Sequence, residues 1–396
     1  MGYYKMKTIF ILCLFLVLSS CISDYEAIRL KDMSGLLVVE GLIIEEGTKI
    51  FISRTVEVND KLSQIDYTGV TNAYIQIIDE GYNMIAVAEE SESDRGTYIV
   101  KKSFSFIPDK KYALDIQIDD KHYQSSFSSP LSTPEIDKVS WQLNDDNSID
   151  IMVSTHDSDN GSLYCLWSFE EDWEIRAPYP TTSRFDPNTN SLVSNSYYYN
   201  DNRYYCWVSD YSKSFLLATS DKFKDATIKD YKIRKLKPGD SRYSYLYSIL
   251  VSQYSIDKES SLYFDNLQRN IEESGSIFAP QPSEKTGNIR CLSNPDETVI
   301  GYIVASKKTT SRLFIPMAEL HLDDLEYKGD CSNIYDLQDS PGTAYFKGYG
   351  VYEEIVSYNV FGIPTSRYRY KYLRCVDCTR RGGTKNKPDF WPNDHQ

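Results

Sequence analysis

The chain has 396 residues, of which 41% are hydrophobic and 25% charged, so it can bury a substantial core and is not disordered by composition. Its formal net charge is −14, which argues against a general nucleic-acid-binding protein because such proteins need basic surface. Tyrosine contributes 33 residues, a composition suited to sheet surfaces and binding faces. At roughly 150 residues per domain, the length favours two to three domains.

The first twenty residues have the features of an export leader. Lys5 and Lys7 precede an apolar run at residues 9–18, which is too short for a membrane-spanning helix of about 20 residues. The run ends in Leu18-Ser19-Ser20-Cys21, which resembles a bacterial lipobox in which the cysteine carries the lipid. We therefore expect a signal peptide at 1–20, lipidation at Cys21 and a lipidated tether over 21–34.

The lipid anchor predicts the outer membrane as the compartment, since two or three acyl chains hold a protein firmly. Asp24 and Glu26 follow the lipobox cysteine and resemble the surface-export signal of Bacteroidota lipoproteins. This pattern favours a cell-surface location, and the periplasmic face is the alternative.

Residues 35–134 show the alternation of half-buried β-strands. Ile75 and Ile77 alternate with Tyr74 and Gln76, and residues 112–119 repeat the pattern. Gly- and Asp-rich turns separate these runs. We therefore expect an N-terminal β-sandwich, which resembles immunoglobulin- and transthyretin-like modules.

A larger β-rich domain is expected over residues 135–378, followed by a C-terminal tail at 379–396. Ile149, Ile151 and Val153 alternate on one face of a predicted strand, and the segment 164–169 reads as another strand. The predicted fold is therefore mostly β throughout.

One main helix is expected near residues 256–274. Ser255 or Asp257 can cap its start, and Gly275 stands where a helix commonly ends. Between these positions Phe264 and Leu267 belong to a single apolar face.

Six cysteines remain after the leader and Cys21. An even number of cysteines in an exported chain predicts disulfides. We expect Cys165 to pair with Cys206, and the next two cysteines to pair with the two C-terminal ones. A redox site or half a zinc site is an alternative at the C-terminal CxxC pair, but no βαβ pattern, second CxxC or paired histidines accompany it. The candidates are Cys165, Cys206, Cys291, Cys331, Cys375 and Cys378.

No HExxH, GxSxG, P-loop or Rossmann motif is present in the sequence. Acidic pairs such as Asp323/Asp324 and Glu353/Glu354 could serve glycoside hydrolysis, but chance produces such pairs in a chain with 57 acidic residues. Residues 157–161 resemble a calcium loop without its later glutamate, and a hairpin turn explains them. We therefore predict no catalytic residues, no metal and no cofactor.

An aromatic segment at residues 196–207 is a candidate ligand surface, because aromatic rings bind the apolar faces of sugars and peptides. The alternative is a half-buried aromatic sheet beside Cys206. The ligand-facing candidates are Tyr197, Tyr198, Tyr199, Tyr204, Tyr205 and Trp207.

Residues 367–387 are basic within an acidic chain. Eight basic residues are opposed only by Asp377, so the segment carries +7. The segment could dock an acidic partner or anionic lipopolysaccharide, or it could neutralise acidic faces of the protein itself. The docking candidates are Arg367, Arg369, Lys371, Arg374, Arg380 and Arg381.

Several short motifs follow the lipobox in a characteristic order. In this order they resemble the Bacteroidota outer-membrane lipoproteins grouped as domain of unknown function 4249. The motifs are LVVEG at 37–41, Trp167 to Trp173, SQY at 252–254, GSIF at 275–278, GNIRC at 287–291, Gly301-Tyr302, CVDC at 375–378, Gly382-Gly383 and KPDFW at 387–391.

The resemblance implies a gene neighbourhood with TonB-dependent receptors, and it transfers no site residue because the family has no agreed activity. We therefore expect a non-enzymatic accessory or binding component of a TonB-dependent uptake system. Its expected partners are the outer membrane, the receptor and an unidentified small ligand, glycan or peptide, and not nucleic acid. A surface adhesin or host-interaction protein is the alternative, followed by a glycan hydrolase.

Overall fold

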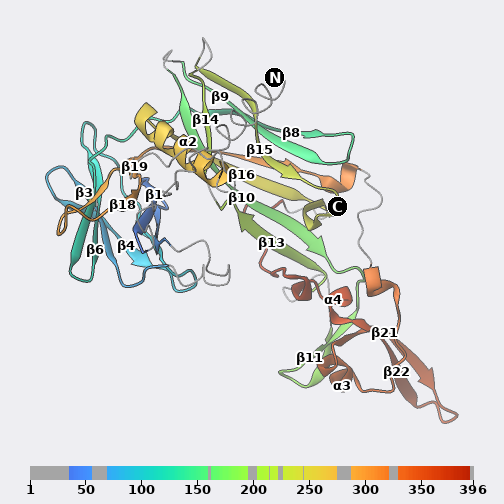
Figure 1. Cartoon of the computed structure of the whole chain (residues 1–396). Helices are drawn as coiled ribbons and strands as arrows, with labels where there is room; N and C mark the ends of the chain where they lie inside the picture. Colours follow the sequence, from blue (N-terminus) through green and yellow to red (C-terminus); the bar gives the residue numbers. More distant parts are fainter. Residues whose placement is uncertain are drawn as a thin grey trace, which may run out of the picture.

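The computed structural model describes residues 35–55, 69–158, 162–194, 203–213, 215–221, 226–243, 245–273, 287–320 and 329–392. The predictions for the leader, Cys21 and the tether lie outside these ranges, as do those for Tyr197, Tyr198 and Tyr199. The described chain is mostly β, as predicted. Figure 1 shows an N-terminal sheet, a central pair of sheets and a separate group of hairpins at the opposite end of the molecule from the N-terminal sheet.

The N-terminal sheet has ten strands in the order β17-β7-β6-β3-β4-β5-β2-β1-β18, with β19 also paired to β1. Buried residues of its strands, such as Ile52, Ile77 and Leu114, form one shared core. The strands are β1 (Leu37–Ile43), β2 (Lys49–Arg54), β3 (Tyr74–Asp79), β4 (Met84–Glu90), β5 (Thr97–Ile99), β6 (Tyr112–Ile118), β7 (Lys121–Ser125), β17 (Ile289–Cys291), β18 (Val299–Gly301) and β19 (Val304–Ala305).

Three of these strands come from residues 289–305, which the sequence analysis assigns to the second domain. β18 and β19 pair in parallel with β1, and β17 pairs with β7. The later segment covers sheet edges that would otherwise present unpaired backbone groups. The N-terminal domain is therefore discontinuous in sequence.

The central region consists of two sheets that enclose a second core (Figure 1). Ile151 of one sheet and Trp167 and Ile249 of the other are buried in this core. One sheet contains β13 (Tyr205–Tyr211), β10 (Tyr164–Arg176), β16 (Tyr247–Ser255) and β20 (Lys308–Ile315), with β14 (Leu216–Thr219) beside β10; the other contains β15 (Thr227–Leu236), β9 (Ile149–His156) and β8 (Ile136–Leu143). Short 3₁₀ turns lie at Ser241–Tyr243 (η2) and Met317–Leu320 (η3).

The main helix, α2 (Lys258–Glu273), begins after Asp257, one of the two capping residues considered in the sequence. The Asp257 carboxylate accepts a hydrogen bond from the Ser260 backbone N–H at 2.7 Å, which satisfies one of the free amides at the helix start. Phe264 of this helix packs at an apolar junction with Leu42 of the first sheet and Leu166 of the second. This cluster joins the two domains.

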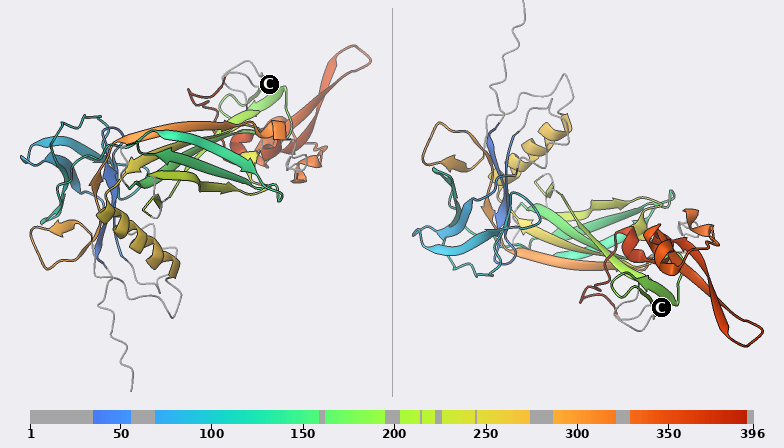
Figure 2. Two further views of the ribbon diagram at one scale, coloured as in Figure 1. Left: turned by 90° about the horizontal axis from the view of Figure 1, so that it is seen from above. Right: turned by 90° about the horizontal axis from the view of Figure 1, so that it is seen from below.

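A distal region is made of residues 183–194 and 329–381. The following residues return to the central sheet, where the ring of Trp391 lies 5.9 Å from that of Phe314 of β20. Ala344, Val351 and Tyr370 form the small core of the distal region. Figure 2 shows its longest hairpin projecting from the end of the molecule opposite the first sheet. The elements are β11 (Ser183–Asp186), β12 (Ser191–Ser194), η4 (Gly329–Ser332), α3 (Pro341–Phe346), β21 (Tyr349–Tyr358), β22 (Pro364–Tyr372), α4 (Leu373–Val376) and η5 (Cys378–Arg381).

Candidate functional site

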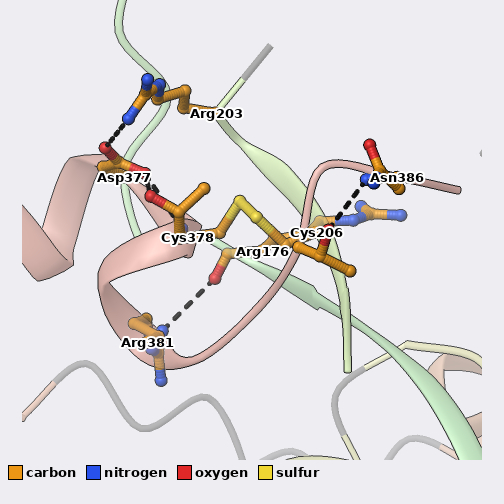
Figure 3. Close-up of a disulfide and its surroundings, with 9 residues drawn as sticks. Arg176, Arg203, Cys206, Asp377, Cys378, Arg381 and Asn386 are labelled. Carbon is orange, nitrogen blue, oxygen red and sulfur yellow. Dashed lines mark hydrogen bonds and ion pairs between the residues drawn. A yellow bond between two sulfur atoms is a disulfide. The ribbon is translucent and has the colours of Figure 1, made fainter. Parts of the chain in front are cut away.

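Two disulfides fix the distal region. Cys206 of β13 bonds to Cys378 of η5 (Figure 3), and Cys331 of η4 bonds to Cys375 of α4. The two cysteines of the CxxC pair thus belong to different bridges. This arrangement is structural, and it does not match a redox pair in which the two cysteines bond to each other.

The predicted pairing of Cys165 with Cys206 is wrong, as is the prediction of a disulfide at Cys291. Both Cys165 and Cys291 are buried free thiols. Cys206 lies opposite Ile175 on β10, so Cys165 is ten residues further along that strand, at about 33 Å and out of disulfide range. Cys291 belongs to the first sheet and is far from the distal bridges in the fold.

The Cys206–Cys378 bridge brings the predicted aromatic and basic segments together. The backbone N–H of Trp207 donates to the Thr384 carbonyl at 2.8 Å, and the Thr384 N–H donates back at 2.8 Å. Gly383 passes so close to Cys206 that an added Cβ would lie 2.5 Å from the cysteine Cβ. The two surfaces expected from separate parts of the sequence are therefore one region.

The described aromatic residues are only partly available to a ligand. Trp207 is 5% exposed, so its assignment as a ligand-facing residue is wrong: it lies on the buried side of β13. Tyr204 and Tyr205 are half-buried, and the Arg176 guanidinium lies 5.0 Å from the centre of the Tyr205 ring. Half-buried sheet is thus the better description of this part of the segment.

Lys371 is also wrongly assigned to the docking surface, because it is 1% exposed. Its ammonium donates to the backbone carbonyls of Cys331 at 2.7 Å and Asn333 at 3.2 Å. The rings of Tyr179 and Tyr352 lie 3.8 Å and 4.9 Å from the same nitrogen. Burial lowers the pKa of this lysine, and its carbonyl and aromatic contacts compensate for the lost water.

Arg367 and Arg369 make ion pairs inside the distal region. Their guanidinium groups lie 3.7 Å and 3.5 Å from the Asp336 carboxylate, and Arg369 also lies 3.2 Å from Glu353. These contacts fit the interpretation that part of the basic segment neutralises the protein's own acidic groups.

The remaining docking candidates, Arg374, Arg380 and Arg381, are exposed. Arg380 donates to the Tyr345 hydroxyl at 2.7 Å, and Arg381 donates to the Arg176 carbonyl at 3.3 Å (Figure 3). Each arginine is therefore oriented by a contact with its own chain and still faces solvent. We call these three residues the arginine surface.

A cleft of about 90 Å³ opens in the distal region, between β11, α3, β21 and α4. Arg184 and Arg203 line it, and Arg203 forms a 2.9 Å ion pair with Asp377. Burial and the charge of Arg203 lower the pKa of Arg184, and burial followed by both arginines lowers that of Lys385. The carboxylates of Asp186 and Asp377 also line the cleft and partly offset these positive charges.

The sequence analysis did not identify Arg184 or Arg203 as site residues. Neither lies in the basic segment; Arg203 lies within the aromatic segment 196–207, whose candidates were its aromatic residues. Arg203 reaches Asp377 because the neighbouring Cys206 is bonded to Cys378, and the sequence did not predict that pairing. A correct assignment of the Cys206–Cys378 disulfide would have indicated that Arg203 lies near Asp377.

The acidic pair Glu353/Glu354 does not form a facing pair of carboxylates. Glu353 contacts Arg369, whereas Glu354 accepts a 2.6 Å hydrogen bond from Ser366. Successive residues of a strand point to opposite faces. Asp323 and Asp324 lie outside the described residues, and within the described ranges no three His, Cys, Asp or Glu side chains are grouped to hold a metal.

The fold and this region define a disulfide-braced, mostly β protein with a cationic distal surface. More particularly, the chain belongs to the family described as "Domain of unknown function (DUF4249)", whose model matches residues 25–312. The resemblance expected from the sequence motifs is confirmed at the level of the family.

Other comparisons add little. A comparison with curated protein sequences finds no match. A crystal structure of a Salmonella alpha-2-macroglobulin mutant aligns at 6% identity and a TM-score of 0.15, covering 82% of this chain and 16% of that chain. A likeness at this TM-score carries no argument. In the described part of the chain, no helix is long and apolar enough to cross a membrane.

Proposed function

We propose that this chain is a lipid-anchored outer-membrane protein of Bacteroidota that acts by binding, as an accessory of a TonB-dependent receptor. The observation that supports this proposal is the gathering of cations in the distal region of a chain whose net charge is −14. Arg184 and Arg203 line the cleft together with Asp186 and Asp377, and Lys385 is close enough to feel the charge of both arginines. The arginine surface lies on the neighbouring α4 and η5.

Such a region suits the recognition of acidic groups on a partner. Complementary charge accelerates encounter and fixes orientation, and the effect weakens as salt screens it. The two disulfides hold the arginines and the cleft on one frame, which limits the entropy lost on binding. The binding function is thus supported by electrostatics and rigidity together.

The membrane anchor in this proposal is Cys21, within the sequence Leu18-Ser19-Ser20-Cys21. Lipidation there would hold the binding region at the outer membrane, where it could meet a receptor. The acidic residues Asp24 and Glu26 support an orientation toward the cell surface rather than the periplasm. Such a system would take up a small molecule, glycan or peptide.

Charge reversal tests the role of the arginine surface. Arg380→Glu with Arg381→Glu should reduce receptor co-purification in low salt, and raised salt should weaken the wild-type complex in the same direction. Lys229→Glu with Lys237→Glu is the matched control, because it makes the same change of net charge at two exposed sites on the central region. Equal co-purification by both double variants, each with unchanged thermal unfolding, would remove the arginine surface from the proposal.

A further inference from the structure

The end of the β21–β22 hairpin is an exposed apolar tip. Residues 356–366 contain no charged side chain. Tyr358, Val360, Phe361 and Ile363 are 72%, 94%, 84% and 57% exposed, and Val356 is 49% exposed. Exposed apolar residues are ordinary when scattered singly, but a contiguous group usually marks a contact site.

The backbone of the tip is already hydrogen-bonded within itself. The Asn359 side-chain oxygen accepts the N–H groups of Phe361 and Ile363, both at 2.9 Å. The Asn359 N–H donates to the Ile363 carbonyl at 3.0 Å, and the Gly362 N–H donates to the Asn359 carbonyl at 2.9 Å. Gly362 permits this turn with a φ of 71°. Four amides of the turn therefore need no water, which lowers the cost of moving the tip into an apolar medium.

The same features favour a bilayer over a protein as the occupant. Protein interfaces combine apolar contacts with about one hydrogen bond per 100–200 Å² of interface. In this tip, four backbone N–H groups already donate hydrogen bonds within the turn, so they cannot donate to a protein partner. The exposed apolar residues lie at the end of a two-stranded hairpin that projects from the molecule (Figure 2), so a protein would need a deep apolar socket to cover them. A fluid lipid interface closes around such a shape without a preformed socket.

The charges behind the tip fit anionic headgroups. Arg367 pairs across the ribbon with Ile355, whereas Glu354 pairs with Tyr368, one position further from the tip. The first charge behind the apolar end is therefore a cation. Its 3.7 Å contact with Asp336 joins two largely exposed side chains, and such a pair contributes little and can exchange partners.

We propose that the apolar tip of the β21–β22 hairpin inserts into the interfacial layer of a bilayer with anionic headgroups. Val360, Phe361 and Ile363 enter the acyl boundary, Tyr358 lies at the headgroup level and Arg367 meets lipid phosphates. This contact lies at the end of the molecule opposite the first sheet, which follows the lipid anchor in the chain. It rests on the proposed function only in placing the protein at a membrane.

Vesicle sedimentation tests the insertion without the acyl chains. The full mature chain carrying Cys21→Ala is mixed with vesicles of phosphatidylcholine alone or with added phosphatidylglycerol. We expect binding that is stronger on the anionic vesicles, and Val360→Asp with Phe361→Asp should weaken it at least about tenfold because two apolar side chains no longer enter the lipid. Met84→Asp with Leu262→Asp, at two exposed apolar positions elsewhere, is the matched control and should bind normally.

Depth of insertion provides a second measurement. A Phe361→Trp variant should gain a blue-shifted emission component with these vesicles, and brominated phosphatidylcholine should quench it. Sedimentation that does not distinguish the tip variant from its control, or folded protein that binds neither vesicle, would overturn the proposal. Receptor co-purification depends on Arg380 and Arg381 and not on the tip. A tip that does not bind vesicles would therefore leave the proposed receptor binding intact, and a loss of receptor binding would leave the membrane insertion of the tip intact.

Discussion

Glu171 is a buried carboxylate of the central region that accepts hydrogen bonds from three side chains. Its side chain is 1% exposed, yet it accepts hydrogen bonds from the Tyr247 hydroxyl at 2.6 Å, Arg234 at 3.0 Å and Arg242 at 3.2 Å. These partners come from β15, β16 and η2, so one carboxylate on β10 ties three other elements together. Removing it would break the ion pair of the partly buried Arg234 and leave Arg242 with only the partly exposed Asp210 and Asp240 as carboxylate partners.

We expect Glu171→Ala to lower the free energy of unfolding by about 3–5 kcal/mol, the usual cost of breaking a buried ion pair. Tyr247→Phe should cost about 1 kcal/mol, because only one hydrogen bond is lost. Urea unfolding measures both, with the exposed neighbour Glu170→Ala as the control, expected within about 0.5 kcal/mol of wild type. A Glu171 variant as stable as the control would contradict this account of the core.

Asp79, at the end of β3, gives the N-terminal domain a specific dependence on pH. Its hydrogen bond with Lys110, at 2.5 Å, and those with Asn83 and Gly81 hold the pKa of this carboxyl well below its ordinary value. A lowered pKa in the folded state means that the stabilisation is present above the unfolded pKa, near 4, and is lost as the pH falls toward the folded value.

Asp79→Asn should therefore lower the melting temperature most at neutral pH. The difference from wild type should narrow as the pH falls from about 4 to 2, because the unfolded wild-type chain takes up a proton on Asp79 in this range and is thereby stabilised, whereas the folded state still carries the charge. Thermal unfolding of the two proteins in parallel across this range checks the prediction. A difference that stays constant with pH would show that the charge of Asp79 is not what stabilises the turn.

At the level of elements, the two disulfides determine where the distal region lies. They close segments separated by 172 and 44 residues, and a disulfide over such lengths typically stabilises by about 2–4 kcal/mol. We expect Cys206→Ser with Cys378→Ser to lower the melting temperature and to release the 378–387 segment from β13. Increased proteolysis within that segment would report the release.

Mass spectrometry under non-reducing conditions tests the pairing directly. Peptides joining Cys206 to Cys378 and Cys331 to Cys375 should be found, and Cys165 and Cys291 should react with an alkylating reagent only after unfolding, since both are buried. A peptide joining Cys375 to Cys378, or any bridge to Cys165, would contradict the structure.

Local patterns predicted the elements well. Alternation placed the buried faces of β6 and β9, and the capping Asp257 placed the start of α2, because each signal lies within one element. Pairing across long separations could not be predicted in this way: β18 joins β1 in parallel, although residues 37 and 299 are far apart in sequence. The same limit explains the wrong cysteine partners, the missed Arg184–Arg203 cleft and the buried Lys371.

At the scale of the whole molecule, the proposed lipid anchor, the arginine surface and the apolar tip lie on different parts of the chain. The arginine surface lies on α4 and η5, beside the cleft between β11, α3, β21 and α4. The apolar tip is the end of the β21–β22 hairpin, which projects away from the central sheets (Figures 1 and 2). The proposed anchor at Cys21 precedes the first sheet. A protein with these features would be held at a membrane while presenting its cationic region to a partner.

A single substitution can test the proposed lipidation. Cys21→Ala should abolish fatty-acid labelling and release most of the protein from the membrane fraction, because the thiol that takes the lipid is absent. Ser20→Ala, which keeps a small residue before Cys21, is the control and should retain both. Labelling that persists in the Cys21 variant would show that the anchor is elsewhere.

The central claim is that the protein binds an outer-membrane receptor. The most direct measurement is crosslinking in intact cells, followed by solubilisation of the outer membrane, purification of the lipidated protein and identification of what is attached. The account predicts a TonB-dependent receptor as the principal crosslinked protein, with crosslinks concentrated in the distal region near Arg380 and Arg381. Recovery of no receptor would contradict the claim, and recovery of host or surface proteins instead would favour an adhesin.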